Sequence, residues 1–322
     1  MPTPTVATDL ITVVSPAHNE ADGIEAFHQR LVAAVTEIPN ASWEFIYVED
    51  GSTDATFARL SDIAETDDRV RVLRLSRNFG HQLAITCGLD HSTGDAVVVI
   101  DSDLQDPPEV IAQMVAEWRD GADVAYGQRR QRAGETRFKR VTATAYYRLM
   151  SRVTDVEIPQ EVGDFRLMNR TVVEALKGMR EENRYIRGMI SWIGFEQRAV
   201  LYDRDPRHSG SSSYSLLKMV NLAANGITSF TEKPLRIASF VGAAIFALTI
   251  VVVIYTVVSR LLDPTGSSAG FATITVLVMF FGGVQLLSIG LLGEYVGRIY
   301  RESKARPLYV VREAKVKEMD QS

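Results

Sequence analysis

Hydrophobic residues in the first part of the chain occur in short runs, and the stretches between these runs have helical spacing. The runs are rich in β-branched residues and lie at 10–15, 45–48, 70–75 and 96–100, with 124–126 as a candidate fifth. Between the first two runs, apolar residues recur every three or four positions from Ile24 to Val35. An alternation of strands and helices predicts a Rossmann-like, mostly parallel sheet that is covered by helices on both faces.

Two much longer apolar stretches occur later in the chain. Residues 237–258 contain no charged side chain, and only uncharged polar side chains interrupt residues 272–292. At about 1.5 Å per residue each is long enough to cross a bilayer as a helix, whereas a buried core helix is typically shorter. Basic residues flank the pair, but the link between them carries only Arg260, which Asp263 offsets. We therefore expect an integral membrane protein with a two-helix transmembrane hairpin, whose α/β domain and both termini are cytoplasmic.

These patterns divide the chain into four segments. We expect the α/β domain at 1–212, an amphipathic interface helix at 213–234, the hairpin at 235–298 and a cytoplasmic tail at 299–322. The interface helix is expected from one stripe of apolar side chains within 214–229. Such a helix either lies in the membrane interface or packs on the α/β domain, and the stripe alone does not separate these alternatives.

Composition and charge add two constraints. The single cysteine, Cys87, excludes an intrachain disulfide and favours a reducing compartment. The net charge of −5 hides two opposed parts, because residues 1–124 carry −15 and residues 125–322 carry +10. Residues 129–152 hold eight Arg or Lys against Glu135 alone. A solvated helix face normally mixes the two signs, so this cluster favours contact with anionic head groups or a phosphate.

Polar side chains follow the predicted strands, at the edge of the sheet where ligands bind in this fold class. The segment after the fourth strand is Asp101-Ser102-Asp103. Two carboxylates at this spacing can converge on one Mg²⁺ or Mn²⁺, and Gln105 offers a further oxygen. Charged loop ends are common, so an Asp-x-Asp pair alone is a weak signal. Its position after the β-branched run at 96–100 favours a metal site.

The other candidate residues have structural alternatives. Asp50 ends the second strand and can accept hydrogen bonds from a nucleobase or a ribose, although an Asp-Gly turn is an ordinary reason for an Asp there. His18 and His81 have no partner nearby in sequence, and we interpret both as structural residues or as part of a substrate wall. The sequence contains no dinucleotide fingerprint, P-loop, zinc motif or nucleophile elbow.

Seven segments, in chain order, resemble the polyisoprenyl-phosphate glycosyltransferases of glycosyltransferase family 2. They are VVSPAHNE (13–20), VEDGSTD (48–54), LSRNFGHQLAI (75–85), DSDLQDPPE (101–109), GDFRLMNR (163–170), RHSGSSSYS (207–215) and LLGEYVGRIYRESKARPLYVV (291–311). Together they cover nearly the whole chain, and the last segment is similar to the bacterial branch with two membrane spans. His18 and Glu49 differ from the residues that are common at these positions in the family. These differences bear on how the nucleobase is bound and not on the activity itself.

The resemblance implies a GT-A catalytic domain that requires Mg²⁺ or Mn²⁺. The implied reaction is an inverting transfer of a single sugar from a nucleotide sugar to undecaprenyl or dolichyl phosphate. UDP-glucose is the first expectation for the donor, with UDP-N-acetylhexosamine and GDP-mannose as alternatives. The resemblance also implies a homo-oligomer, specifically a tetramer, in the membrane, with no nucleic-acid partner.

Carried over position by position, the resemblance implies a role for each candidate residue. The residues implied to bind the nucleotide sugar are Pro16, Asn19, Glu20, Asp50, Asp101 and Ser102. The implied metal ligands are Asp101, Asp103 and Gln105. The implied catalytic residues are Asp103, Asp164 and Arg207. Asp164 either positions the acceptor or acts as a base, and an ordinary turn carboxylate is the equally weighted alternative. The resemblance places Ser212 and Tyr214 beside the acceptor phosphate, and the basic cluster adds Arg129, Arg137, Lys139 and Arg140 as residues expected to contact the acceptor phosphate or lipid.

Two other functions compete with single-sugar transfer. A processive polysaccharide synthase of the same superfamily is disfavoured, because the chain has no Gln-x-x-Arg-Trp motif and only two predicted spans. An inactive nucleotide-sugar-binding scaffold is disfavoured by the intact pair Asp101 and Asp103 and by Arg207. A strong general base is not required for transfer to a phosphate, which already carries about −1.5 to −2 charges at pH 7.

Overall fold

The computed structural model describes residues 8–130, 162–203 and 270–315, together with isolated positions between 240 and 262. The chain forms two compact units. The first comprises residues 1–151, 156–213 and 307–322, and the second comprises residues 152–155 and 214–306. The first unit therefore contains chain from both sides of the apolar region.

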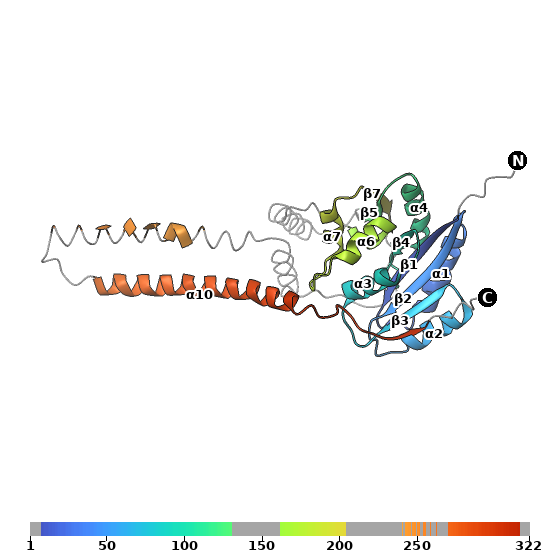
Figure 1. Ribbon diagram of the computed structural model, residues 1–322, viewed down its shortest axis with the longest axis horizontal. Coiled ribbons are helices and arrows are strands. Elements are labelled where there is room, and N and C mark those ends of the chain that lie inside the picture. The colour runs from blue at the N-terminus through green and yellow to red at the C-terminus, as the bar shows by residue number, and fades with distance from the viewer. Residues whose placement is uncertain are drawn as a thin grey trace. The chain divides into compact units, whose positions relative to one another are not determined.

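The first unit is built on an eight-stranded sheet with the order β7-β5-β6-β4-β1-β2-β3-β8 (Figure 1). Its strands are β1 (Asp9–Ala17), β2 (Ala41–Glu49), β3 (Val70–Leu75), β4 (Ala96–Val99), β5 (Val124–Arg129), β6 (Val162–Asn169), β7 (Gln197–Tyr202) and β8 (Val311–Lys315). The first four strands pair in parallel, as do β5 and β7, whereas β6 runs antiparallel to both β4 and β5. The predicted mostly parallel α/β sheet is confirmed.

Helices cover both faces of this sheet. They are α1 (Ile24–Thr36), α2 (Thr56–Thr66), α3 (His81–His91), α4 (Ile111–Arg119), α6 (Arg170–Gly178) and α7 (Ile186–Ile193), with a 3₁₀ turn η1 (Pro108–Val110) before α4. Successive strand residues point to opposite faces, so Val13 joins the core beneath α1, α2 and α4, while Val14 joins the core beneath α3, α6 and α7. The apolar spacing from Ile24 to Val35 predicts the buried face of α1 correctly.

The predicted tail at 299–322 contains the strand β8, which no sequence pattern predicts. It pairs antiparallel with β3 and forms one edge of the sheet. Just before it, the Tyr309 hydroxyl donates a hydrogen bond to Asp90 at 2.7 Å, and Tyr309 packs with Val311 against the core around α3. The sequence VREAK has little β-branched or alternating character, so its strand conformation comes from pairing with β3.

The second unit contains the long helix α10 (Gly270–Ser303), which includes the predicted span at 272–292. Among the described residues, one helical segment, Phe280–Ser303, is long and apolar enough to cross a membrane by length and composition, with a mean hydropathy of 1.3. The predicted interface helix at 213–234 lies outside the described residues, and the predicted span at 237–258 is described only at isolated positions. The two-span hairpin therefore stays a prediction.

Candidate active site

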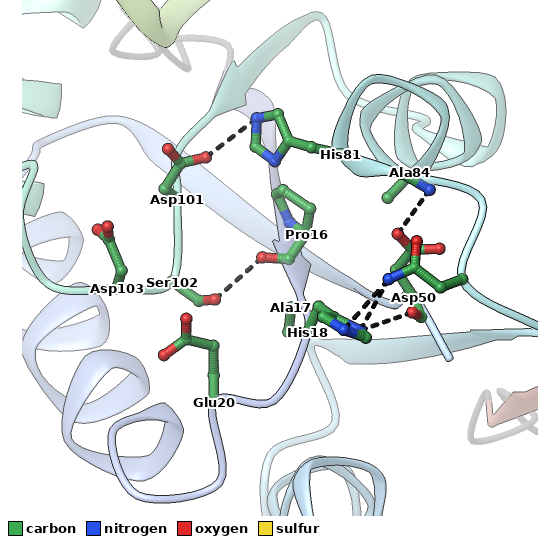
Figure 2. Close-up of a pocket in the computed structure, with 12 residues that line it drawn as sticks. Pro16, Ala17, His18, Glu20, Asp50, His81, Ala84, Asp101, Ser102 and Asp103 are labelled. Atoms are coloured by element: carbon green, nitrogen blue, oxygen red, sulfur yellow. Dashed lines mark hydrogen bonds and ion pairs between the residues drawn. The ribbon is translucent and has the colours of Figure 1, made fainter. Parts of the chain in front are cut away.

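A cavity of about 270 Å³ lies beyond the carboxyl ends of β1, β2 and β4 (Figure 2). Six of the predicted site residues line it, namely Pro16, Glu20, Asp50, Asp101, Ser102 and Asp103. The other lining residues are Ala17, His18, Asn78, Gly80, His81 and Ala84. The cavity thus combines residues from three strand ends with the loop that begins α3. This is the edge at which ligands bind in open α/β sheets.

Asp50 shapes the cavity through the backbone of the next loop. Its side chain is buried, and its carboxylate accepts hydrogen bonds from the N–H groups of Phe79 at 2.7 Å and Gly80 at 2.9 Å. Gly51 has φ +63°, and a Cβ atom there would lie 2.3 Å from the backbone nitrogen of Asn78. The Asp-Gly turn is therefore required by the close approach of two loops. The predicted contact of Asp50 with the nucleoside stays a prediction.

The loop after β1 is held against the loop after β2. The Asn19 backbone has φ +57°, and its side-chain Oδ1 accepts a hydrogen bond from the N–H of Thr53 at 2.9 Å. His18 Nδ1 lies 2.8 Å from the Asp50 carbonyl oxygen, and its ring also contacts the Asn78 amide. His18 lines the cavity, as the substrate-wall interpretation predicts, whereas Asn19 is not among the lining residues.

Asp101 and Asp103 both line the cavity from the loop after β4. The Asp101 Oδ1 atom is buried and accepts no hydrogen bond from the described residues. Burial raises the pKa of Asp101 to about 6. Two carboxylates, one with a buried oxygen that accepts no hydrogen bond, fit a hard divalent cation such as Mg²⁺ or Mn²⁺. Among the described residues no three His, Cys, Asp or Glu side chains form a metal-binding group, so other ligands would have to complete the shell.

Gln105 is placed differently from the two carboxylates. Its backbone N–H donates to Asp103 Oδ1 at 3.0 Å, and its side chain is buried and absent from the cavity lining. Leu104, between them, has φ +59°, which turns the chain sharply after Asp103. Gln105 thus helps to orient Asp103 through its backbone, and its side chain as a metal ligand stays a prediction.

Cation binding is expected to weaken as the pH falls through about 6. The folded-state pKa of Asp101 lies above its ordinary value, so a proton occupies the carboxylate below that pH and the cation must displace it. The apparent Kd for Mn²⁺ should rise about tenfold per pH unit below pH 6. Titration of the protein with Mn²⁺ in the presence of UDP at a series of pH values measures this. An affinity for Mn²⁺ that does not change between pH 5 and 7 would contradict the assignment.

Asp164, on β6, is held by three side chains, and it contacts the lining residue His81 without itself being among the residues that line the cavity. The Gln82 amide donates to its carboxylate at 3.0 Å, and His81 Nε2 and Arg187 Nε each lie 3.2 Å away. Burial acts to raise the pKa of Asp164, but the hydrogen bond with His81 and the charges of Arg187 and Arg166 outweigh it, so the pKa lies well below the ordinary range. Asp164 is therefore an ionised carboxylate with little affinity for a proton.

His81 lines the cavity, as the substrate-wall interpretation predicts, and its partners are residues that lie far away in the sequence. His81 is the first residue of α3, and its Nε2 lies 3.5 Å from Asp101 (Figure 2). The same atom lies 3.2 Å from Asp164. Its two carboxylate partners lie 20 and 83 positions further along the chain, so no local spacing reveals the cluster. Only the placement of β6 beside β4 brings Asp164 to Asp101.

Of the residues predicted to bind the acceptor, Arg129 is described. It ends β5, where its Nε donates to the Tyr202 hydroxyl at 3.2 Å and its guanidinium lies 3.6 Å from Asp106. Asp106 follows the Asp-x-Asp loop, so these contacts hold Arg129 near that loop. The other predicted residues, Arg137, Lys139, Arg140, Arg207, Ser212 and Tyr214, lie outside the described residues.

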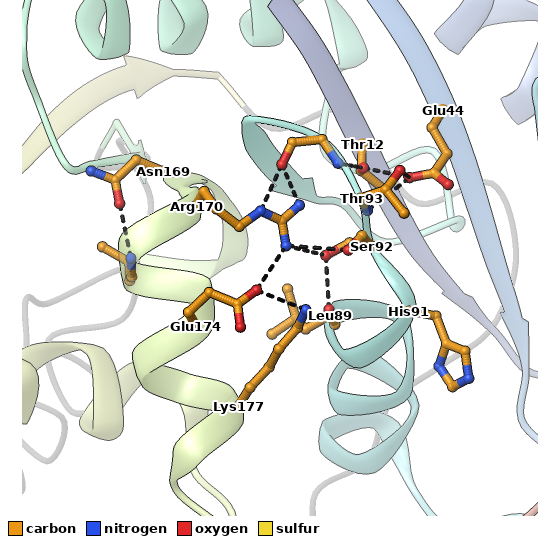
Figure 3. Close-up of polar contacts among 12 residues, drawn as sticks. Thr12, Glu44, Leu89, His91, Ser92, Thr93, Asn169, Arg170, Glu174 and Lys177 are labelled. Carbon is orange, nitrogen blue, oxygen red and sulfur yellow. Dashed lines mark hydrogen bonds and ion pairs between the residues drawn. The ribbon is translucent and has the colours of Figure 1, made fainter.

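A second polar cluster, around Arg170, lies at the opposite end of β4 and is structural (Figure 3). The Arg170 guanidinium donates to the carbonyl oxygens of Gly94 and Ser92 and pairs with Glu174 at 3.2 Å. It thereby ties the loop before β4 to the start of α6. In this cluster Arg170 supplies hydrogen-bond donors to backbone carbonyl oxygens. Such pairing of backbone acceptors is typical of a contact that stabilises the fold.

Replacement of Arg170 by alanine is expected to lower the Tm of the catalytic domain by about 5 °C, because two carbonyl oxygens lose a charged donor. Arg59→Ala is the matched control, since Arg59 makes an exposed ion pair with Glu25, and exposed pairs contribute little. Thermal unfolding of the detergent-solubilised protein measures both variants. Equal Tm values for the two variants would contradict the structural role of Arg170.

The fold and the cavity define a GT-A-like α/β domain with an acidic site at the carboxyl edge of its sheet. Residues 12–177 match the family model for glycosyl transferase family 2, and residues 233–299 match the model for the GtrB C-terminal hairpin. The chain belongs to glycosyltransferase family 2 and is a transferase of that family.

Named relatives extend this similarity over nearly the full length. The chain is 43% identical to the uncharacterized glycosyltransferase YkcC of Bacillus subtilis, with 94% of this chain and 93% of the relative covered. It is 40% identical to the bactoprenol glucosyl transferase of Shigella phage SfV, with 95% of this chain and 99% of the relative covered. A solved mannosyltransferase, PcManGT of Pyrobaculum calidifontis in complex with GDP-Man and Mn²⁺, is 17% identical, covers 90% of this chain and 89% of its own, and has a TM-score of 0.44.

Proposed function

We propose that the protein transfers a single sugar from a nucleotide sugar to a polyprenyl phosphate at the cytoplasmic face of a membrane. The observation that carries this proposal is the cavity at the carboxyl edge of the sheet, which Asp50, Asp101 and Asp103 all line. The match to the GtrB C-terminal hairpin and the similarity to a bactoprenol glucosyl transferase support a lipid acceptor. UDP-glucose is the proposed donor, with UDP-N-acetylhexosamine or GDP-mannose as alternatives.

The donor would bind across the cavity. Asp50 and the loops that it holds would contact the nucleoside, as would Pro16, Asn19 and Glu20. Asp101 and Asp103 would hold Mg²⁺ or Mn²⁺, which when bound would supply positive charge for the leaving diphosphate. The two carboxylates alone do not make a complete set of metal ligands.

The acceptor would approach from the side of Asp164. An acceptor phosphate is itself an ionised nucleophile, because its second pKa is about 6. One of its oxygens would form the new bond to the anomeric carbon as the bond to the diphosphate breaks. A single in-line displacement of this kind inverts the configuration of that carbon. Arg129 and Arg207 would balance the phosphate charges, and the basic segment at 129–152 would face anionic lipid.

The remaining parts of the proposal concern assembly and topology. We place both termini and the catalytic domain in the cytoplasm, with two membrane spans and an amphipathic helix at 213–234. The α10 sequence and the flanking basic residues support this arrangement. A homo-oligomer is proposed from the family resemblance.

The proposal is tested by incubation of purified protein with radiolabelled nucleotide sugars and undecaprenyl phosphate, with and without EDTA. Formation of an organic-soluble labelled product that EDTA abolishes is the expected result. A labelled polymer would instead identify a processive synthase. The absence of any product with every donor would indicate a nucleotide-sugar-binding scaffold, and an EDTA-resistant product would remove the cation from the mechanism.

A further inference from the structure

His81 joins two carboxylates that arise from neighbouring antiparallel strands. Val99 of β4 pairs with Arg166 of β6, and continuation of this register places Asp101 opposite Asp164. The His81 Nε2 atom lies 3.5 Å from the first carboxylate and 3.2 Å from the second. The ring nitrogen lies within hydrogen-bond distance of Asp164 and within ion-pair distance of Asp101. A proton on this nitrogen offsets the repulsion between the two carboxylates.

The position of His81 depends on Asp50, which we propose contacts the nucleoside. His81 begins α3 directly after Gly80, whose N–H is bound by the Asp50 carboxylate and whose φ is +100°. Asp50 therefore sets the point at which α3 starts and the direction from which the imidazole enters. The side chain is still 42% exposed, so the ring faces the cavity rather than the core.

The residue after His81 holds the other side of the same carboxylate. The Gln82 amide nitrogen donates to Asp164 at 3.0 Å, and its amide oxygen accepts from the N–H of Ile186 at 3.0 Å. Ile186 begins α7, which also carries Arg187 against Asp164. The first turn of α3 thus connects the end of β4, β6 and α7.

We propose that His81 is a positioning residue that bridges Asp101 on the donor side and Asp164 on the acceptor side, and so keeps the acceptor phosphate in line with the sugar. The inference rests on the proposed function, because it assigns the two carboxylates to two substrates. Without the imidazole, nothing between the two carboxylates offsets their repulsion, and Asp164 loses one of the three side chains that hold it. Donor binding is largely retained, since the loops around Asp50 remain intact, whereas productive binding of the acceptor is lost.

The test compares His81→Ala, His81→Gln and the control His91→Ala, which changes a histidine at the other end of α3. His91 contacts the carbonyl oxygen of Cys87 and does not line the cavity. For His81→Ala we expect kcat/KM for polyprenyl phosphate to fall about 10- to 100-fold, the range seen when a partner of a ligating side chain is lost. The affinity for UDP with Mn²⁺, measured by calorimetry without acceptor, should stay close to the wild-type value, because the loops held by Asp50 do not depend on the His81 side chain. His81→Gln keeps a donor and should recover most of the activity, and His91→Ala should match the wild type.

Each other outcome has a defined meaning. Wild-type kcat/KM in His81→Ala overturns the inference. A His81→Gln variant as impaired as His81→Ala, with one limb of the pH–rate profile lost, shows acid–base chemistry by His81 and also overturns it. An equal loss of UDP affinity and of acceptor kcat/KM makes His81 a donor-binding residue, which contradicts the bridge. The activity of the wild type is measured first. If the wild type transfers no sugar, the proposed function fails, and this failure is distinct from any effect of the His81 variants.

Discussion

Replacement of Asp103 by asparagine is expected to lower kcat for sugar transfer by about 10²- to 10³-fold, the loss typical of one electrostatic stabiliser of a leaving group. Asparagine keeps the shape of the side chain and can still accept the N–H of Gln105, which Asp103 Oδ1 accepts at 3.0 Å. The loop should therefore keep its conformation. The substitution removes the negative charge that would hold the cation beside the diphosphate.

The measurement is the rate of formation of labelled lipid product at saturating donor and acceptor. Asp62→Asn is the matched control, because Asp62 is exposed on α2, away from the cavity lining. The Tm of both variants should stay at the wild-type value, and Mn²⁺ should bind only to the control. An Asp103→Asn enzyme with unchanged kcat would show that the carboxylate of Asp103 is not part of the metal site.

The second large effect is expected for Asp164→Asn, with a fall in kcat/KM for the acceptor of at least about 100-fold, because a partner of several ordered groups is lost. The carboxylate is the shared partner of His81, Gln82 and Arg187. It also offsets the charge of the buried Arg166, whose pKa burial lowers to about 10. Loss of this charge leaves two guanidinium groups without their carboxylate and disorders the acceptor side of the site.

The pH dependence separates the two roles that the sequence allows for Asp164. Its folded-state pKa lies below the ordinary value, so its contribution is present above that pKa and is lost only as the pH falls through it. Between about pH 5 and 9, titration of Asp164 should therefore not shape the pH–rate profile of the wild type. The profile of Asp164→Asn should have the same shape at a lower rate. Loss of an acid limb of the profile in the variant, with UDP affinity and Tm unchanged, would establish Asp164 as a general base and contradict the positioning role.

The parts of the fold that sequence patterns predict are those with local periodicity. The β-branched runs and the helical spacing between them predict β1 to β5 and α1, because buried strands and amphipathic helices each have a repeat that shows in a few residues. The runs at 10–15 and 96–100 also predict that Asp101 and Asp103 meet the loop after β1 at one edge. The antiparallel strands β6 and β8 are not predicted, since their partners lie far away in the sequence.

Sequence patterns likewise predict only some of the residues of the candidate site. Pro16, Glu20 and Asp50 are predictable, because each follows a recognisable strand and parallel strands place such residues together. The role of His81 is not, because its partners depend on the register between β4 and β6 and on where Asp50 makes α3 begin. The same long-range pairing brings Arg187 of α7 to Asp164.

The pairing of β8 with β3 has a consequence for biogenesis. A ribosome releases β8 only after it has made the apolar region that precedes it, including α10. Until then β3 presents an open strand edge, which is a template for pairing with other chains. The sheet is therefore complete only after the whole apolar region has been made and β8 has paired with β3. If that region enters a membrane, as we propose, its insertion can begin before the sheet is complete. Synthesis that stops between α10 and β8 would leave the edge of β3 unprotected and prone to aggregation.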